Sequence, residues 1–346
     1  MKTPKELGFY FPAEWAHHEA TWLSYPHNEN SWPGKIDSIF KSYNMFIKTL
    51  SEVETVHINV QDDAMRQHVL EQLKACGTFM VNIETHLFPT NDAWCRDHGP
   101  SVLLSHNTLG HRAIVDWNYN AWGGKYPPFD LDNKIPSRIA DYLNIDDIFH
   151  PGIIMEGGSV DFNGQGDLLT TTACLLNPNR NPSLSQEQIE EKLRDYYGVD
   201  NIIWLGEGID GDDTDGHVDD LSRFVNEDTI VTVVEHNAAD PNYEPLKENL
   251  KLLNSCRLKS GRQPNVCELP MPDPVIWEGQ RLPASYANFY ICNDMVIFPT
   301  YKCDSDNRAA YRLEDCFPDR EIIGIDSTDI IWGLGSFHCL SQQIPS

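Results

Sequence analysis

Hydrophobic positions switch between helical and strand spacing along the N-terminal part of the chain. Apolar residues recur every three or four positions over 37–51, which predicts an amphipathic helix. Residues 54–60 alternate as in a half-buried strand. A second helix is predicted over 62–75 and a second strand over 79–88. This part of the chain therefore predicts the order helix, strand, helix, strand.

The same mixture of elements continues to the end of the chain. Ser185 and Gln188 match a capping box, and Gly198 suits the end of the helix that they begin. Glycine and proline are spread evenly and no low-complexity linker interrupts the pattern, so we expect one α/β domain over 1–346. Strands are predicted at 102–105, 113–117, 159–162, 168–172, 201–205, 218–224, 229–234, 266–269, 286–292, 295–299 and 321–325, and helices at 135–143, 185–197, 245–254 and 307–316.

Charge and cysteine usage narrow the classes of partner. The chain has 26 Lys and Arg against 52 Asp and Glu, a net charge of −26. Such a field repels nucleic acid and anionic lipid and attracts small cations, although acidity can also serve solubility alone. No run of about 20 apolar residues predicts a membrane span, and no apolar N-terminal run predicts a secretory signal. The nine cysteines are scattered without a CxxC pair, so we expect a reducing cytoplasm.

The segment 213–219 contains a candidate catalytic pair. If His217 opens a strand, His217 and Asp219 project to the same side, because strand residues two apart share a face. A titratable base beside a carboxylate can act with a nucleophile. Cys339, near the end of the chain on a glycine-rich turn, is the candidate third member. The alternative is a solvated acidic loop followed by an ordinary strand.

Two further segments combine polar and aromatic residues. Trp94 and Asp97 belong to a polar stretch over 91–100, which suits either a pocket wall or a turn with a buried ion pair. Trp122 lies among Asn and Gly residues over 115–125, which suits either a pocket rim or a loop packed on the surface. Neither segment is decisive by itself.

The candidate polar residues recur once in each repeat of the predicted elements. Asp97, Glu156, His217, Asn288 and Cys339 are separated from one another by 51 to 71 residues. A loose unit of two strands, a helix and a strand recurs about every 60–70 residues. A ring of similar modules would bring one such residue from each module to a shared axis. Scattered loops offer no reason for this spacing.

Five motifs in order resemble the agmatine deiminases, which are grouped with the Porphyromonas-type peptidylarginine deiminases. The resemblance covers nearly the whole chain and implies the pentein fold, a five-bladed α/β-propeller of ββαβ-type modules around a central active site. The motifs are Asn91-Asp92-x-Trp94-x-Arg96-Asp97-x-Gly99-Pro100, Glu156-Gly157-Gly158-Ser159, Leu175-Leu176-Asn177-x-Asn179-Arg180-Asn181-Pro182, Asp213-Thr214-Asp215-Gly216-His217-x-Asp219 and Gly335-Ser336-x-His338-Cys339-x-x-Gln342-Gln343.

The resemblance implies a role for each catalytic candidate. Cys339 is expected to be the nucleophile and His217 the general acid and base. Asp97 and Asp219 are expected to bind the guanidinium through paired hydrogen bonds. Glu156 is expected to orient His217.

Further residues are expected to contact the substrate. Trp94 resembles a wall of the substrate channel, and Asp213 falls where the family has an acidic residue near the distal amine of agmatine. Trp122 and Asn288 complete the predicted substrate contacts. One departure is Leu334, which stands between Gly333 and Gly335 where the family usually has a third glycine.

The expected reaction is hydrolysis of agmatine to N-carbamoylputrescine and ammonia through a covalent thiouronium on Cys339, with no cofactor and no metal. The alternatives are a peptidylarginine deiminase, another guanidine-modifying enzyme such as an amidinotransferase, and a polyamine-binding protein that would not need Cys339. A zinc site of His217, Asp219, Glu156 and Cys339 is disfavoured, because no HExxH pair occurs. The expected partner is a small cation, and enzymes of this kind often form homo-oligomers.

Overall fold

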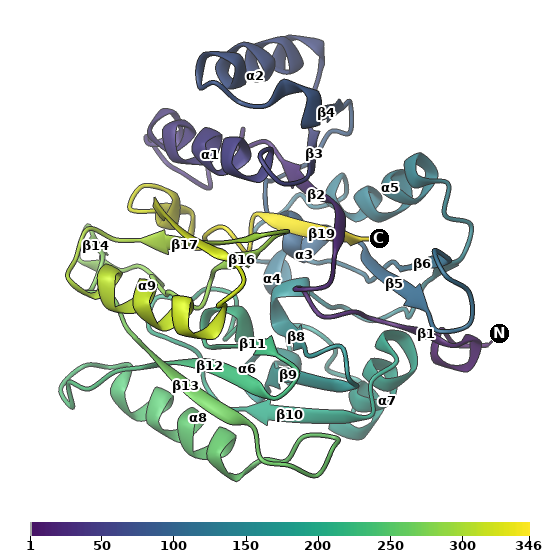
Figure 1. The fold of residues 1–346 in the computed structure, drawn as a ribbon, viewed down its shortest axis with the longest axis vertical. Coiled ribbons are helices and arrows are strands. Elements are labelled where there is room, and N and C mark those ends of the chain that lie inside the picture. The colour runs from purple at the N-terminus through teal and green to yellow at the C-terminus, as the bar shows by residue number, and fades with distance from the viewer. Residues whose placement is uncertain (1) are drawn as a thin grey trace.

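Five sheets of three or four strands surround the centre of the molecule in the computed structural model, which describes residues 2–346 (Figure 1). In four of them an antiparallel pair is followed by a helix and then by a third strand that is parallel to the second. A parallel connection needs a long crossover, and the helix supplies it. The helices α1, α5, α7, α8 and α9 lie toward the outside in Figure 1, and the short helices α3 and α4 lie near the middle.

These four modules follow one another between residues 101 and 326. Their pairings are β5–β6–β7, β8–β9–β10, β11–β12–β13 and β16–β17–β18, and β1 (Phe9–Tyr10) adds to the edge of the first. Their bounds are β5 (Ser101–Ser105), β6 (Arg112–Val115), α5 (Ile135–Leu143), β7 (Ile148–Phe149); β8 (Val160–Phe162), β9 (Asp167–Thr171), α7 (Gln186–Tyr197), β10 (Asn201–Leu205); β11 (Ser222–Asn226), β12 (Thr229–Val234), α8 (Tyr243–Ser255), β13 (Asn265–Pro270); and β16 (Tyr290–Ile291), β17 (Met295–Thr300), α9 (Ser305–Cys316), β18 (Glu321–Asp326).

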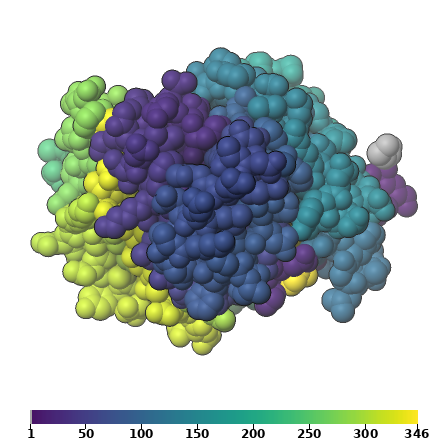
Figure 2. Space-filling model, turned by 90° about the horizontal axis from the view of Figure 1, so that it is seen from above, coloured from purple at the N-terminus to yellow at the C-terminus, as the bar shows by residue number. Residues whose placement is uncertain are grey.

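The fifth sheet joins the two ends of the chain. β19 (Ser341–Pro345) pairs antiparallel with β2 (His18–Ser24), and β3 (Thr55–Asn59) and β4 (Ile83–His86) extend the sheet in parallel. In Figure 2 the C-terminal residues, in yellow, emerge beside the N-terminal residues, in purple. The helices α1 (Ile36–Leu50) and α2 (Asp63–Ala75) are the two crossovers of this sheet.

Short elements line the centre and the connections. The hairpin β14–β15 pairs Ile276–Trp277 with Gln280–Arg281. None of the helices within residues 2–346 combines the length and the apolar character that crossing a membrane requires. The remaining bounds are η1 (Lys5–Leu7), η2 (Met80–Asn82), α3 (Cys95–His98), α4 (Ala121–Gly124), η3 (Asp132–Lys134), η4 (Gly157–Ser159), α6 (Thr172–Leu175), η5 (Val218–Asp220) and η6 (Ile330–Gly333).

Local sequence signals set several of these elements. Ser185 caps α7 by accepting from the backbone N–H of Gln188, whose side chain accepts from the backbone N–H of Ser185. The helix ends at Gly198, which has a φ of 71° that glycine adopts without strain. The predicted capping box and helix end are therefore confirmed.

Three predicted strands differ in the structure. The strand expected over 79–88 is reduced to β4, because residues Met80–Asn82 form the 3-10 turn η2. The other two differ for a shared reason. The strand expected over 218–224 is wrong at its start, because residues Val218–Asp220 form the 3-10 turn η5 and β11 begins only at Ser222. The strand expected over 286–292 is reduced to Tyr290–Ile291. In both segments the preceding residues turn inward, where buried side chains hold them. The strands β2 and β19 were not predicted, since their pairing joins residues from opposite ends of the chain.

Candidate active site

A cavity of about 640 Å³ opens among the loops that connect the modules. Its wall includes residues from Asn30 to Cys339, so segments from nearly the whole chain contribute to it. Five of the predicted residues lie in this wall, namely Trp94, Asp97, Trp122, Asp213 and Cys339. The volume is in the range of small-molecule sites.

Asp97 is held rigidly at the inner end of the cavity. It belongs to the short helix α3, and its two carboxylate oxygens accept from separate donors. The backbone N–H of Gly158 donates to Oδ1 over 2.9 Å, and the indole N–H of Trp122 donates to Oδ2 over 2.9 Å. Trp122 itself has a φ of 55°, which turns the chain sharply inside α4. Trp122 therefore positions Asp97 as well as walling the cavity.

Three of the predicted catalytic groups converge on Gly158. A Cβ atom added to this glycine would lie 2.7 Å from His217 Nδ1, 2.9 Å from Asp219 Oδ2 and 3.0 Å from Asp97 Oδ1. All three side chains are buried. The glycine therefore leaves room for a base and two carboxylates to meet.

His217 and Asp219 reach this point from a turn and not from a strand. His217 immediately precedes η5, and Asp219 lies within it. Neither ring nitrogen of His217 has a hydrogen-bond partner among the described residues, and its Nδ1 lies 3.8 Å from Asp97 Oδ1. Burial lowers the pKa of His217 to about 3, against the opposing effect of Asp219. The imidazole is therefore neutral near pH 7 and can accept a proton.

Cys339 lies at the inner end of the cavity beside carboxylates. Its thiol is 3.5 Å from Asp219 Oδ2, within range of a weak S–H hydrogen bond. Burial raises the pKa of this thiol well above its usual value, and Asp219, Asp220 and Asp97 raise it further. The thiol form is therefore favoured until positive charge enters the site.

Asn288 holds the nucleophile and does not line the cavity. Its side-chain amide donates to Cys339 Sγ over 2.9 Å and to Asp220 Oδ1 over 3.0 Å. The side-chain oxygen Oδ1 of Asn288 accepts hydrogen bonds from the backbone N–H groups of His338 and Cys339, over 3.1 and 3.3 Å. The expectation that Asn288 contacts the substrate is thus replaced by a contact with the sulfur, because the side chain points to the backbone of the nucleophile's turn.

His338 and Glu14 are site residues that sequence reasoning missed. His338 Nδ1 lies 2.6 Å from Asp219 Oδ2, and its Nε2 lies 2.8 Å from Glu14 Oε2. Burial alone would raise the pKa of Asp219, but the hydrogen bond and charge of His338 hold it below its usual value. His338 stood in the motif before Cys339, and that adjacency was the only signal in the sequence.

Glu156 is bound by an arginine. Arg180 Nε donates to Glu156 Oε1 over 2.6 Å, and both side chains are buried. Oε2 of Glu156 has no partner among the described residues. A carboxylate oxygen of Glu156 and an imidazole nitrogen of His217 lie within 4.8 Å of each other. The structure therefore places Glu156 beside His217 without a direct hydrogen bond between them.

Asp213 lies at the mouth of the cavity with two partners. Lys125 Nζ is 3.2 Å from Asp213 Oδ1, and the hydroxyl of Tyr126 donates to Oδ2. Asp213 is half-buried, in contrast to the groups around Gly158. Its carboxylate is thus set apart from the inner carboxylates and can meet a second positive charge.

Leu334 completes the turn before Cys339 in a left-handed conformation, with a φ of 70°. A Cβ on Gly335 would lie 2.6 Å from the ring of Trp94, and a Cβ on Gly333 would lie 2.6 Å from the ring of Trp32. The two glycines are required by these close approaches, whereas Leu334 points a side chain to the cavity wall. The turn therefore forms with leucine at its centre.

Donors that could also hold a metal occur in the site. The two groups are Glu156, Cys174 and His217, and Asp219, Asp220 and Cys339. In the first group Glu156 is paired with Arg180, and in the second Asn288 donates to both Cys339 and Asp220. Arg180 and Asn288 thus already donate hydrogen bonds to these potential metal ligands. The arrangement therefore suits a guanidinium better than a metal ion.

The neutral imidazole, the thiol, the carboxylates and the aromatic wall together describe a site for a planar organic cation. Two carboxylates can accept the N–H groups of a guanidinium in paired hydrogen bonds. A nucleophile beside its carbon and a base within the same buried space are the parts that amidine hydrolysis needs.

Known proteins resemble this chain over almost its full length. A "Putative agmatine deiminase" of Legionella pneumophila is 38% identical over 346 residues, which cover 99% of this chain and 96% of that protein. The structure of the agmatine deiminase of Enterococcus faecalis superposes with a TM-score of 0.93 at 32% identity, covering 100% of this chain and 98% of that one. A substrate-bound agmatine deiminase of C. jejuni gives a TM-score of 0.88 at 35% identity, covering 98% and 96%.

The match to a family extends over almost the full length. Residues 10–345 match the family described as Porphyromonas-type peptidyl-arginine deiminase. The matched residues include each of the site residues that line the cavity or surround Gly158. The protein has the pentein fold, and the chain belongs to the Porphyromonas-type peptidyl-arginine deiminase family.

Proposed function

We propose that this protein hydrolyses agmatine to N-carbamoylputrescine and ammonia, with residues 1–346 acting as one catalytic unit. The observation that carries the proposal is the meeting of His217, Asp219 and Asp97 at Gly158, with the Cys339 thiol 3.5 Å from Asp219. The relatives named agmatine deiminase support the same reaction.

The charges of the cavity favour agmatine over arginine. Agmatine carries a guanidinium and a primary amine, both cationic near pH 7, whereas arginine adds a carboxylate. None of the described residues that line the cavity is a lysine or an arginine, and several are acidic. Lys125, beside Asp213 at the mouth, is already paired with Asp213 and Asp215. A substrate carboxylate would therefore be desolvated without a free cationic partner, which is costly. The acidic lining includes Asp92, Asp97, Asp212, Asp213 and Glu278.

Binding of the guanidinium prepares the nucleophile. Asp97 and Asp219 fix the plane of the guanidinium, which brings its carbon to Cys339. The added positive charge offsets the carboxylates that raise the pKa of the Cys339 thiol. The substrate itself thus favours the reactive thiolate, and without the substrate the thiol stays protonated and protected from side reactions.

The first chemical step forms a carbon–sulfur bond and breaks a carbon–nitrogen bond. The thiolate of Cys339 adds to the guanidino carbon, and His217 takes up the proton that the thiol has lost. His217 then delivers this proton to the departing amine, which leaves as ammonia. A thiouronium remains on Cys339.

The second step releases the product. His217, neutral again, removes a proton from water, whose oxygen attacks the thiouronium carbon. The carbon–sulfur bond breaks as the hydroxyl proton of the adduct passes to the leaving sulfur, the urea-type product leaves with Cys339 as the thiol, and His217 releases its proton to solvent. Asp97 and Asp219 continue to hold the N–H groups of the intermediate, so the carbon stays in place for the incoming water.

We also infer that the protein works in a reducing compartment, the cytoplasm. All nine cysteines are free thiols in the structure, and burial raises the pKa of Cys95 to about 12, which keeps this thiol of α3 unreactive. Free thiols persist where the glutathione pool is reduced.

The test compares ammonia release from agmatine, free arginine and an arginyl peptide at equal concentration. We expect release from agmatine at a rate far above that from the other two. Cys339→Ser should remove the activity while the circular dichroism spectrum stays unchanged, and Cys76→Ser, at a half-buried cysteine away from the cavity, should retain it. Faster ammonia release from the arginyl peptide would instead identify the protein as a peptidylarginine deiminase. Binding of agmatine without ammonia release would contradict the proposal that the protein is an enzyme.

A further inference from the structure

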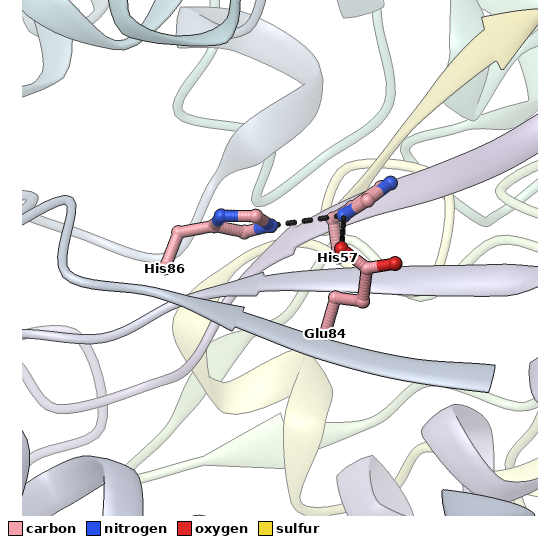
Figure 3. A group of neighbouring side chains, drawn as sticks. All are labelled: His57, Glu84 and His86. Carbon is pink, nitrogen blue, oxygen red and sulfur yellow. Dashed lines mark hydrogen bonds and ion pairs between the residues drawn. The ribbon is translucent and has the colours of Figure 1, made fainter. Parts of the chain in front are cut away.

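A second group of titratable side chains lies outside the cavity, on the sheet that joins the chain ends. His57 comes from β3, and Glu84 and His86 come from the neighbouring strand β4 (Figure 3). The parallel pairing sets His57 opposite Glu84 and Asn59 opposite His86. Residues two apart in a strand share a face, so Glu84 and His86 project to the same side. None of these three residues lines the cavity.

The ligand-type atoms of this group are close together. His57 Nδ1 lies 2.9 Å from His86 Nε2 and 3.7 Å from Glu84 Oε2. Ligand atoms of all three residues lie within 4.8 Å of one another. Two imidazole nitrogens bound tetrahedrally to one metal ion at about 2.0–2.1 Å stand roughly 3.3 Å apart. The two ring nitrogens are therefore already close to the spacing of a pair that binds one ion.

We propose that His57, Glu84 and His86 form a binding site for a divalent first-row transition-metal ion such as Zn²⁺. Imidazole selects such ions over Mg²⁺ and Ca²⁺, which prefer all-oxygen ligands. Three protein ligands leave one coordination position for water. The expectation from sequence that the protein holds no metal considered only the active-site residues, and the strand pairing brings together residues 57, 84 and 86.

Neighbouring side chains fix the orientation of the ligands. The indole of Trp22 stacks on His57 at a centroid distance of 4.4 Å and on His86 at 4.7 Å. The hydroxyl of Tyr142 donates to Glu84 Oε2. Such outer contacts hold ligands in place and typically strengthen metal binding. The two rings are therefore held before any ion arrives.

The site is buried on the histidine side and open on the glutamate side. His57 and His86 are 5% and 7% exposed, whereas the side chain of Glu84 is 48% exposed. Burial lowers the pKa of both histidines, so their imidazoles are neutral and carry a lone pair. An ion can thus enter from solvent past Glu84 and meet two neutral nitrogen ligands.

The charges around the group leave Glu84 as the negative ligand. The nearby carboxylate of Glu19 is paired with Arg112 over 2.7 Å. The nearby cation Arg66 is paired with Asp63 over 3.1 Å on α2. These two charges are largely offset by their own partners, so the carboxylate of Glu84 faces an incoming cation without strong competition.

Metal binding requires a change of tautomer and no net loss of protons. In the pair shown in Figure 3, one ring nitrogen carries the hydrogen that the other accepts. When both nitrogens bind the ion, that hydrogen moves to the other nitrogen of the same ring through solvent. The ion then replaces the hydrogen as the link between β3 and the edge strand β4.

The test uses the full-length protein, freed of metal by a chelator and titrated with Co²⁺. Co²⁺ bound by imidazole and carboxylate shows visible bands without the near-ultraviolet thiolate band that cysteine ligands produce. We expect one such thiolate-free site in the wild type. Glu84→Gln should weaken its Kd at least tenfold, and His86→Gln should abolish it. Zn²⁺ at one fixed concentration should raise the Tm of the wild type more than that of Glu84→Gln.

The matched control is His111→Gln, because His111 is an exposed histidine 2.8 Å from the carboxylate of Asp147 and lies outside the group. It should bind Co²⁺ as the wild type does. Glu84 is exposed, so its substitution keeps the fold even if His86→Gln does not. Equal Co²⁺ affinity in the wild type and Glu84→Gln, or a spectrum of thiolate ligation alone, would overturn the proposal.

Discussion

His338 lies between two carboxylates, with Nδ1 2.6 Å from Asp219 and Nε2 2.8 Å from Glu14. The ring thereby connects the residue that is proposed to hold the guanidinium to a buried carboxylate behind it. Glu14 also pairs with Arg96 and Arg223, at 3.2 and 3.0 Å. Asp219 is therefore one end of a continuous buried network, and its protonation depends on His338.

Replacing His338 should move the acid limb of activity. His338→Phe removes the hydrogen bond and charge that hold the pKa of Asp219 down, so this pKa should rise. The limb of kcat/KM that depends on ionised Asp219 should then shift to higher pH. A profile identical to that of the wild type would contradict this role.

The same substitution should cost stability. Removing one partner of a buried ion pair commonly lowers the free energy of unfolding by about 3–5 kcal/mol. Urea unfolding measures this loss. His338→Gln is the control for the pH effect, because it keeps one hydrogen-bond donor and should recover part of the wild-type profile.

Asn288→Leu should lower kcat with little change in KM. The substitution keeps the volume but removes the donor 2.9 Å from the Cys339 sulfur and the acceptor of two backbone N–H groups. Leaving such buried groups unpaired costs about 1–3 kcal/mol each. We expect kcat to fall roughly 100-fold, since 1.4 kcal/mol corresponds to a factor of ten. Steady-state kinetics with agmatine measure both constants, and a raised KM at unchanged kcat would instead indicate a substrate contact.

Alkylation of Cys339 should accelerate with pH beyond the range of an ordinary thiol. Burial and three carboxylates raise the pKa of this thiol well above its usual value. Only the thiolate reacts, so its alkylation rate with iodoacetamide should rise about tenfold per pH unit between pH 7 and 9. Mass spectrometry of the peptide that contains residue 339 measures the rate. A plateau below pH 8 would show that the free enzyme already holds a thiolate.

Gly158→Ala should inactivate the enzyme. The added methyl carbon would lie 2.7 Å from His217, 2.9 Å from Asp219 and 3.0 Å from Asp97, which forces at least one of them to move. Displacements of about 1 Å can cost a hundredfold in rate. Gly206→Ala is the control, because its nearest neighbour would be the side-chain oxygen of Asn249 at 3.3 Å. We expect the control to retain activity in the ammonia assay.

Leu334→Gly should stabilise the fold while weakening substrate binding. A leucine at a φ of 70° is strained by about 1–2 kcal/mol, part of which the larger unfolded-state entropy of glycine offsets. The substitution also removes a side chain from the cavity wall, so the KM for agmatine should rise. Thermal unfolding and kinetics measure the two effects separately, and a lower Tm would show that packing of Leu334 outweighs its strain.

Elements with local signals could be predicted from sequence, because their stabilising contacts are close in the chain. The helix that begins at Ser185 and ends at Gly198 has its cap, its amphipathic face and its terminator within 14 residues, and the structure confirms it. The strand predicted at 218–224 was wrong at its start because the buried contacts of Asp219 and Asp220, with His338 and Asn288, override the apolar pattern.

The site was predictable where polar residues recur once per module, and not where a side chain acts through distant partners. Asp97 and Cys339 could be assigned to one cavity from motif and spacing, and they line it. His338 and Glu14 are 324 residues apart in the sequence, so no local sequence pattern could predict their contact. The same holds for Asn288, whose chemistry depends on a sulfur 51 residues away.

The pairing of β19 with β2 has a consequence for biosynthesis. Cys339 lies two residues before the start of β19, and this strand pairs with β2, which is synthesised more than 300 residues earlier. On the ribosome, the nucleophile and its supporting strand emerge after every other part of the site. A nascent chain in which β2 and the acidic loops are already folded therefore lacks the nucleophile, and turnover can begin only after β19 has paired with β2.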